Sequence, residues 1–358
     1  MRGRMMVEEP MGPNPNIAVV GATGAVGREC LSILEQRRFP HGAIRVLASA
    51  RSAGTAIRYR GRELRVEELG DRSFDGCGIV FFAAGSDTSK AFAPRAVAAG
   101  AVAIDKSSAH RMAPGVPLVI PEINGDLLGP LREEPGIVAV PNCSTIVMLV
   151  PLEPLRRAFG VERIIVSTYQ AASGAGAAAM DELREQTRSV LAGGSATPRV
   201  FKEPCAFNVF SHDSAMDPVT GYNGEESKMA GEARRIWNDP SVRVNATCVR
   251  VGVLRGHSES IHVTLRTPAT ERQVRDALAG GESVRLVDDR AGNSFPTPLK
   301  ATGGDDVLVG RLRPDETLDP VRRGGDTLWR AFNLFVSGDQ LRIGAALTAV
   351  KIAERLIA

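Results

Sequence analysis

One cysteine, Cys143, stands where this sequence could most readily make a nucleophile. It follows an apolar, strand-like run at 137–140 and precedes an apolar, helix-like run at 146–155. A thiol at the start of a helix meets unpaired backbone N–H groups and the positive end of the helix dipole, and both favour the thiolate. The same N–H groups could stabilise an oxyanion formed when that thiolate attacks a carbonyl. The alternative is a buried structural thiol, and the strand-end position argues against it.

A second chemical signal is a glycine-rich turn that comes directly after a buried strand at 17–20 and opens a helix. Glycines in this context allow a tight turn, a close approach of the backbone to a pyrophosphate, and close packing of helix on strand. A tight connection without a ligand is the alternative. The residues expected to contact a dinucleotide here are Gly21, Thr23, Gly24, Ala25, Val26 and Gly27.

The next strand should end near the ribose of a bound dinucleotide. An acidic residue there would favour NAD, but this strand is followed by Ser49, Arg51 and Ser52. Hydroxyls and a guanidinium suit the 2′-phosphate of NADP. The alternative is a solvated loop arginine. Nucleotide binding together with a nucleophilic thiol indicates an enzyme that reduces or oxidises an acyl group held as a thioester.

A nucleophilic cysteine needs a base, and the chain has five histidines. His257 is the preferred acid/base because it lies at a break between two strands, beside Gly256, where the backbone can turn sharply. His212, in a polar segment, is a weaker candidate. His262 is expected to be structural.

Composition narrows the class of protein. The 358 residues suggest two domains, and 44 basic against 41 acidic residues, without a basic run, do not indicate nucleic-acid binding. No apolar run reaches the ~18 residues that a membrane span needs, and residues 1–14 are expected to be a loose leader. Five scattered cysteines have neither metal-ligand nor disulfide spacing, so we expect no metal and a cytoplasmic location.

Strand and helix patterns alternate along the first 140 residues, which predicts βαβ units and a parallel sheet. The pattern then changes to a long strand at 163–170 and two further strands, 242–253 and 258–266, expected to be antiparallel. Residues 193–224 are expected to form a long excursion. An alanine-rich helix at 341–357 is expected to return to the first domain.

The motifs of this chain, and their order along it, resemble those of the aspartate-semialdehyde dehydrogenase family over nearly the whole length. The glycine turn and the Ser49–Gly54 loop match its cofactor segments, and the nucleophile motif is present. The other matching segments are Asp105-Lys-Ser-Ser-Ala-His-Arg111, Val119-Ile-Pro-Glu-Ile-Asn124, Asn142-Cys-Ser-Thr145, Gln170-Ala-Ala-Ser-Gly-Ala-Gly176, Glu225-Glu-Ser-Lys228, Arg250 and Gly256-His-Ser-Glu259.

This resemblance implies NADPH-dependent reduction of aspartyl-4-phosphate to aspartate semialdehyde through a thioester on Cys143, a step of lysine, threonine and methionine biosynthesis. It implies that His257 and Gln170 assist catalysis, and that Arg250 binds the substrate α-carboxylate. Glu226 or Glu225 would hold the amino group. Further implied contacts are Asn142, Arg111 and Lys228 to the substrate or its phosphate, and Gly85, Ser173, Gly174 and Gln340 to the cofactor.

The implied fold is a Rossmann-type, doubly wound parallel sheet with an inserted mixed α/β catalytic and dimerisation domain. The expected boundaries are 15–142 with 335–358 for the NADP-binding domain and 143–334 for the substrate domain. A homodimer is implied as well.

The chain departs from the family pattern at Lys106, Val147, Gly252 and Gln340. A reductase of another acyl phosphate or acyl thioester, such as N-acetylglutamyl phosphate, therefore remains an alternative, as does a nucleotide-binding homologue without activity.

Overall fold

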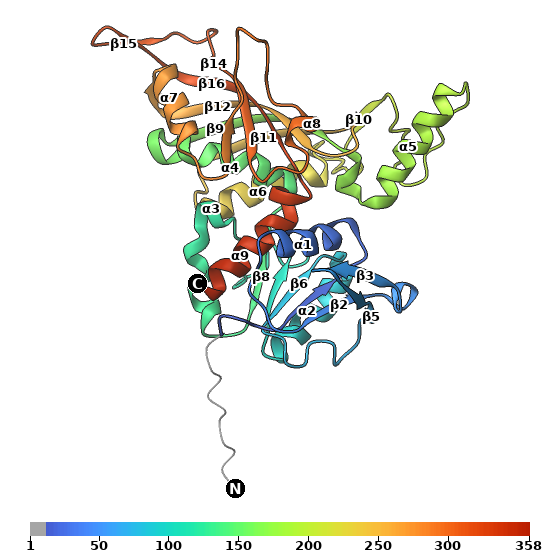
Figure 1. Ribbon diagram of the computed structural model, residues 1–358. Helices are drawn as coiled ribbons and strands as arrows, with labels where there is room; N and C mark the ends of the chain where they lie inside the picture. The colour runs from blue at the N-terminus through green and yellow to red at the C-terminus, as the bar shows by residue number, and fades with distance from the viewer. Residues whose placement is uncertain (1–11) are drawn as a thin grey trace. The chain divides into compact units, whose positions relative to one another are not determined.

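The computed structural model describes residues 12–358, so most of the expected leader lies outside the described residues. The chain forms two compact units (Figure 1). The first contains the described chain up to Pro121, together with Gly125–Val140 and Ala349–Ala358; the second contains Glu122–Asn124 and Pro141–Thr348. Residues 335–348, expected with the first domain, thus belong to the second unit, because the last strand of its sheet continues to Gly338.

A six-stranded parallel sheet forms the centre of the first unit, in the order β5-β2-β1-β6-β7-β8. All these strands run parallel, but successive strands are added on one side of β1 up to β5 and on the other side from β6 onwards. The carboxyl ends of β1 and β6 therefore form the crevice where such sheets bind ligands. The strands are β1 Ile17–Val20, β2 Ile44–Ala48, β5 Glu67–Glu68, β6 Ile79–Phe82, β7 Val102–Asp105 and β8 Ile137–Ala139.

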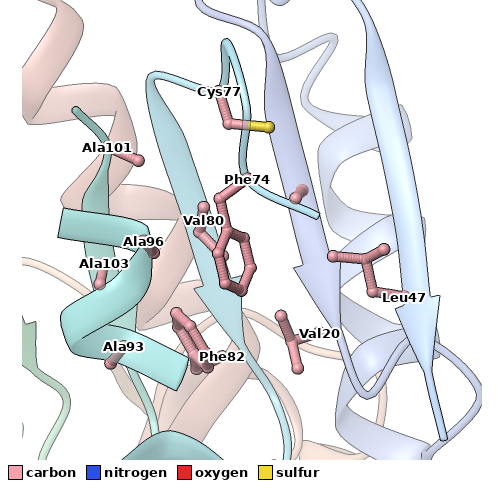
Figure 2. Packing of buried hydrophobic residues seen from close by; sticks show 11 residues of the cluster. Val20, Leu47, Phe74, Cys77, Val80, Phe82, Ala93, Ala96, Ala101 and Ala103 are labelled. Atoms are coloured by element: carbon pink, nitrogen blue, oxygen red, sulfur yellow. The ribbon is translucent and has the colours of Figure 1, made fainter. Parts of the chain in front are cut away.

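The inner strands β1, β6 and β7 are buried along their whole length, as expected of a parallel sheet covered on both faces. Figure 2 shows Phe74, which lies between strands in the sequence, packed with Phe82 and Val20. The rings of Phe74 and Phe82 have centroids 5.9 Å apart. The other elements of this unit are α1 Ala25–Gln36, α2 Ser86–Ala98, the hairpin β3 Ala56–Tyr59 with β4 Arg62–Arg65, and most of α9 Leu347–Ile357.

An eight-stranded mixed sheet forms the second unit, with the path β10-β11-β9-β12-β16-β14-β13 and β15 paired to β16. The two strands expected to be antiparallel, β11 and β12, do run in opposite directions, and β9 lies between them, parallel to β11 and antiparallel to β12. The strands are β9 Val161–Gln170, β10 Val209–Ser211, β11 Arg243–Val251, β12 His257–Ala269, β13 Val284–Leu286, β14 Val307–Pro314, β15 Val321–Arg323 and β16 Asp326–Gly338.

One face of this sheet is buried beneath helices. The strand β9 shows this, since buried residues such as Ile164 and Val166 alternate with exposed ones such as Ile165. The long central helix α4 is buried from Ser144 to Glu153 and contacts β12, and α6 contacts β11. The helices of this unit are α4 Cys143–Phe159, α5 Ala177–Leu191, α6 Gly224–Ile236, α7 Glu271–Ala279 and α8 Pro298–Ala301, with α3 Pro121–Asn124 at its border.

The expected fold class, a Rossmann-type parallel sheet with a mixed α/β second part, is confirmed. The C-terminal helix is shorter than expected, since a π-helical turn at Arg342–Ala346 precedes α9. Within residues 12–358, none of the helices combines the length and apolar character that crossing a bilayer requires.

Candidate active site

The glycine turn lies at the crevice between β1 and β6. Gly21 has a φ of +77°, and a Cβ there would lie 2.7 Å from the carbonyl oxygen of Ala83, so only glycine fits. A Cβ on Gly27 would collide with the carbonyl oxygen of Gly21. Helix α1 begins after Gly24 without a side-chain cap, so its first N–H groups can bind an anionic group. The turn therefore fits a dinucleotide pyrophosphate.

The loop after β2 carries the residues expected to select the cofactor. Arg51 is exposed and forms no ion pair with another described residue, while the hydroxyl of Ser52 lies 3.5 Å from that of Thr23. Gly85 precedes α2, whose N-terminus also lacks a side-chain cap. The loop after β2 could therefore bind a phosphate through a guanidinium and hydroxyls. The open N–H groups at the start of α2 are a separate place for an anionic group.

Cys143 is the first residue of α4, and Asn142 is the helix N-cap. The Asn142 side-chain oxygen accepts hydrogen bonds from the N–H groups of Ser144 (2.9 Å) and Thr145 (3.2 Å), a cap that fixes where the helix begins. Cys143 is partly exposed, whereas the other four cysteines are buried. Burial raises the pKa of Cys30 to about 12 and, opposed in part by Arg250, that of Cys205 to about 11.

A buried carboxylate, Glu225, connects several of these residues. Its side chain accepts hydrogen bonds from Asn142 Nδ2 (2.8 Å) and Gln170 Nε2 (3.1 Å), and Lys228 Nζ lies 3.3 Å away. Burial alone would raise the pKa of Glu225, but His212, Lys228 and the two amide donors together lower it to about 2. Glu225 therefore remains a carboxylate and can hold a cationic group.

The neighbouring Glu226 has a structural role instead. Its two carboxylate oxygens accept from the backbone N–H groups of Asn223 (2.8 Å) and Cys248 (2.9 Å). Glu226 is thus fixed by main-chain donors, whereas the partners of Glu225 are side chains of the candidate site, so the geometry favours Glu225 as the contact for a substrate amine.

Gln170 ends β9 and is almost fully buried. Its amide nitrogen donates to Glu225 and to the hydroxyl of Ser144, the residue after the thiol. Its amide oxygen is buried and accepts no hydrogen bond from the described residues. A buried acceptor without a donor is costly, so the oxygen is suited to a donor supplied by a ligand.

His257 begins β12 and lies against the same segment. Its Nδ1 accepts a hydrogen bond from the backbone N–H of Ala171 (3.0 Å), which places the proton of the neutral ring on Nε2. A Cβ on Gly174 would lie 3.1 Å from Nε2, so this glycine leaves room for the ring. Burial, reinforced by Arg250, lowers the pKa of His257 to about 3. The ring is therefore neutral and presents an Nε2–H donor.

Arg250 lies on β11 directly beside Gln170 on β9. Its side chain is 3% exposed, Nη1 donates to the carbonyl of Ala171 (3.0 Å), and Nη2 contacts both His212 and Asp213 (3.0 Å each). A buried guanidinium with two polar neighbours from the excursion is a strong carboxylate-binding group.

The segment at 339–344 also contacts the region of the thiol. A Cβ on Gly344 would lie 3.0 Å from Cys143 Cβ and 3.2 Å from Gln340 Cβ. The Gln340 amide donates to the Ser173 hydroxyl and accepts from Gly256 N–H (2.9 Å). Gln340 therefore holds the start of β12 to the loop after β9. Its expected contact with the cofactor stays a prediction.

In the first unit, Arg111 is buried and donates to the backbone carbonyls of Val140 (3.0 Å) and Lys106 (2.9 Å). These contacts orient its guanidinium. Its expected role with Lys228 of the second unit, in binding phosphate, stays a prediction.

Three residues at the site were missed by the sequence interpretation. Glu232 accepts from the Asn142 N–H (2.6 Å), Ser144 contacts Gln170, and Asp213 contacts Arg250. Ser144 lies in the Asn142-Cys-Ser-Thr145 motif, which gave no role to its hydroxyl, and Asp213 lies in Ser211-His-Asp-Ser, a run of polar groups in the excursion. Among residues 12–358, no cluster of three or more His, Cys, Asp or Glu side chains could hold a metal.

The comparisons with known proteins agree with this arrangement. The NAD binding domain of semialdehyde dehydrogenases matches residues 16–129, and the dimerisation domain of semialdehyde dehydrogenases matches residues 152–343. The chain belongs to the semialdehyde dehydrogenase family. The family resemblance expected from the sequence is thereby confirmed.

Members of the semialdehyde dehydrogenase family match the chain along almost its whole length. Aspartate-semialdehyde dehydrogenase from Synechocystis sp. is 45% identical, covering 96% of this chain and 98% of the relative. The enzyme from Bacillus subtilis is 43% identical, covering 97% and 98%. A crystal structure of aspartate semialdehyde dehydrogenase II from Vibrio cholerae complexed with ASA has a TM-score of 0.90, 41% identity, and coverage of 96% and 98%.

Proposed function

We propose that the chain is an NADPH-dependent enzyme that reduces L-aspartyl-4-phosphate to L-aspartate 4-semialdehyde, with release of phosphate. The observation that carries the proposal is the arrangement inside the second unit. A thiol at a helix N-terminus lies next to a residue bonded to Gln170, and Gln170 and Arg250 are neighbours across two strands. The curated relatives above are named for this aldehyde.

The thiolate of Cys143 attacks the acyl carbon, a C–S bond forms, and phosphate leaves with the electrons of the C–O bond. The thioester that remains is activated toward hydride. The nicotinamide cofactor, when bound, supplies that hydride. The oxyanion that results on the substrate collapses to the aldehyde and returns the electrons of the C–S bond to the sulfur.

His257 suits a donor role in these steps. Because Nδ1 is occupied by the Ala171 N–H, the Nε2–H of the neutral ring can donate to the oxygen that becomes negative. The positive end of the α4 dipole favours negative charge beside the thiol, while the N–H groups of Ser144 and Thr145 are held by the Asn142 cap.

Substrate recognition follows from the charges. Arg250 binds the α-carboxylate, and Glu225 binds the ammonium group, since it remains ionised in its buried position. Lys228, beside Glu225, binds the phosphate. The exposed guanidinium of Arg51, with Ser49 and Ser52, favours NADP over NAD because no carboxylate follows β2.

A homodimer formed through the second unit and a cytoplasmic location complete the proposal. The first is supported by the match to a dimerisation domain. The second rests only on the cysteine composition.

The test is the reverse reaction with phosphate and either aspartate semialdehyde or N-acetylglutamate semialdehyde, run separately with NADP and NAD. We expect NADP reduction with aspartate semialdehyde alone. Preference for the second aldehyde would favour the alternative acyl phosphate. Activity with neither would favour a nucleotide-binding homologue without this chemistry.

The Cys143→Ser variant tests the nucleophile. Turnover should fall by at least ~10³-fold, because a neutral hydroxyl is a far weaker nucleophile than a thiolate, whereas NADPH binding measured by fluorescence should be unchanged. Cys77→Ser, at a buried thiol of the first unit, is the control. Turnover equal to that of the parent would rule out the thioester.

A further inference from the structure

We propose that Asp213 is a specificity-determining residue, which occupies the Arg250 guanidinium until a ligand carboxylate displaces it. The inference rests on the role of Arg250 in the proposed function. It assigns a role to the polar excursion between α5 and α6, whose Ser211-His-Asp-Ser stretch the proposed chemistry does not otherwise use.

Asp213 forms an ion pair with Arg250, whose guanidinium is buried. Arg250 Nη2 lies 3.0 Å from Asp213 Oδ1, and the side chains of the two residues are 3% and 31% exposed. The pKa of Asp213, which burial would raise, is lowered by its hydrogen bond and charge attraction to Arg250. Asp213 is therefore a carboxylate while it holds the guanidinium.

The donors of Arg250 leave no free edge for a second carboxylate. A guanidinium binds a carboxylate in two-point fashion either through Nε and Nη2 or through Nη1 and Nη2, and each edge uses one of the two Nη2 protons. Nη2 faces Asp213 Oδ1 and His212 Nε2, and Nη1 faces the carbonyl of Ala171. Nε is buried and bonds to none of the described residues. A two-point contact with a ligand thus requires one of the excursion residues to leave.

His212 is the more firmly held of the two. Because an arginine can only donate, His212 Nε2 accepts from Nη2, and His212 Nδ1 lies 3.2 Å from both the hydroxyl and the backbone N–H of Ser214. Ser214 Oγ in turn accepts from the N–H of Glu225 at the start of α6 (3.0 Å). Asp213 is the more exposed residue, so it is the one that leaves.

Asp213 therefore competes with a ligand carboxylate for the Arg250 guanidinium. A ligand with an α-carboxylate replaces one ion pair by another, of better two-point geometry. A ligand without a carboxylate gains nothing at Arg250 and leaves the Asp213 contact in place. Asp213 therefore lowers the affinity of the site for carboxylate ligands but makes no difference to uncharged ones.

Asp213→Asn tests this because it keeps the shape and removes the charge. Binding of L-2-aminobutyrate, a four-carbon amino acid without a reactive carbonyl, is measured by calorimetry on the full chain. We expect the Asn variant to bind about three- to tenfold more tightly, since a part-exposed ion pair no longer competes. The KM for aspartate semialdehyde should fall by a similar factor, and the KM for butanal should not change.

The control is Asp217→Asn, an equal charge change on the same excursion. Among residues 12–358, the Asp217 carboxylate bonds to Val219 and Thr220 alone. It should bind like the parent chain. Equal or weaker binding by Asp213→Asn would overturn the proposal and make Asp213 a permanent support for Arg250. Because calorimetry needs no turnover, it decides this point even if the chain fails to oxidise aspartate semialdehyde.

Discussion

Glu225 is the residue on which the buried polar contacts of the site converge. It is 4% exposed and receives hydrogen bonds from the helix cap Asn142 and from Gln170, with Lys228 beside it. A buried carboxylate is tolerated only when its hydrogen bonds and charge partners compensate for lost hydration. These contacts hold the start of α4, and so the thiol, to the end of β9.

The ionisation of Glu225 predicts a pH-dependent stability. Its folded pKa of about 2 lies below the reference value of 4.5, so its stabilising effect is complete above pH 4.5 and is lost as pH falls toward 2. A pKa shift of this size corresponds to about 3 kcal/mol in the free energy of unfolding. Urea unfolding from pH 6 to 3.5 should therefore show the Glu225→Gln variant less stable than the parent at pH 6, with the difference shrinking on acidification.

Glu63→Gln, at an exposed position in the first unit, is the control and should follow the parent at every pH. If the free energies of unfolding of the parent and Glu225→Gln differed by the same amount at every pH, the pKa of Glu225 would not be lowered in the folded chain.

At the scale of elements, three neighbouring strands bring the candidate residues together. Gln170 ends β9, Arg250 pairs with it from β11, and His257 begins β12 on the other side. The order β11-β9-β12 is needed for this, because it places the strand that carries Gln170 between the other two. Helix α4 then starts at the thiol, beside the end of β9.

The π-helical turn before α9 also limits the space around the thiol. Because an added Cβ on Gly344 would lie 3.0 Å from Cys143 Cβ, Gly344→Ala should push the start of α4 by a few tenths of an ångström. Displacement of a nucleophile by this amount is costly to catalysis, so we expect kcat to fall about tenfold. Overpacking should reduce the free energy of unfolding by about 1–3 kcal/mol.

Steady-state kinetics and urea unfolding would measure both effects. Gly280→Ala, where the nearest atoms to an added Cβ are 3.8 Å away, is the matched control in the same unit. An unchanged kcat for Gly344→Ala would show that the turn does not constrain the thiol.

At the scale of the whole molecule, the outward face of the eight-stranded sheet carries apolar side chains. Ile165 and Tyr169 on β9 are 37% and 39% exposed, and Tyr169 packs against Phe335 of β16. We expect this face to form the homodimer interface. Ile165→Arg should shift the sedimentation coefficient toward a monomer, because it places a charge in an apolar contact.

Leu299→Arg introduces the same charge at an exposed apolar position of α8 and should leave the assembly intact. Dimers of unchanged affinity in Ile165→Arg would place the interface elsewhere.

Much of the fold and several site positions could be predicted because their signals are local. The strand–glycine–helix pattern around Gly21 needs only a tight turn, and the Asn142-Cys143 pair needs only a helix start, so neighbouring residues suffice to indicate them. Family membership and the fold class are confirmed. The roles of the individual side chains stay predictions.

The sequence by itself determined which groups are available: a thiol at a helix start, a glycine turn, a histidine directly after Gly256, and an arginine in a strand. The tertiary structure alone decided that β9 separates β11 from β12, that Ala171 N–H fixes the proton of His257, and that Asp213 contacts Arg250. These contacts join residues 37 to 86 positions apart. Local sequence patterns do not encode such pairs, because strand order and the path of a long excursion depend on packing of the whole unit.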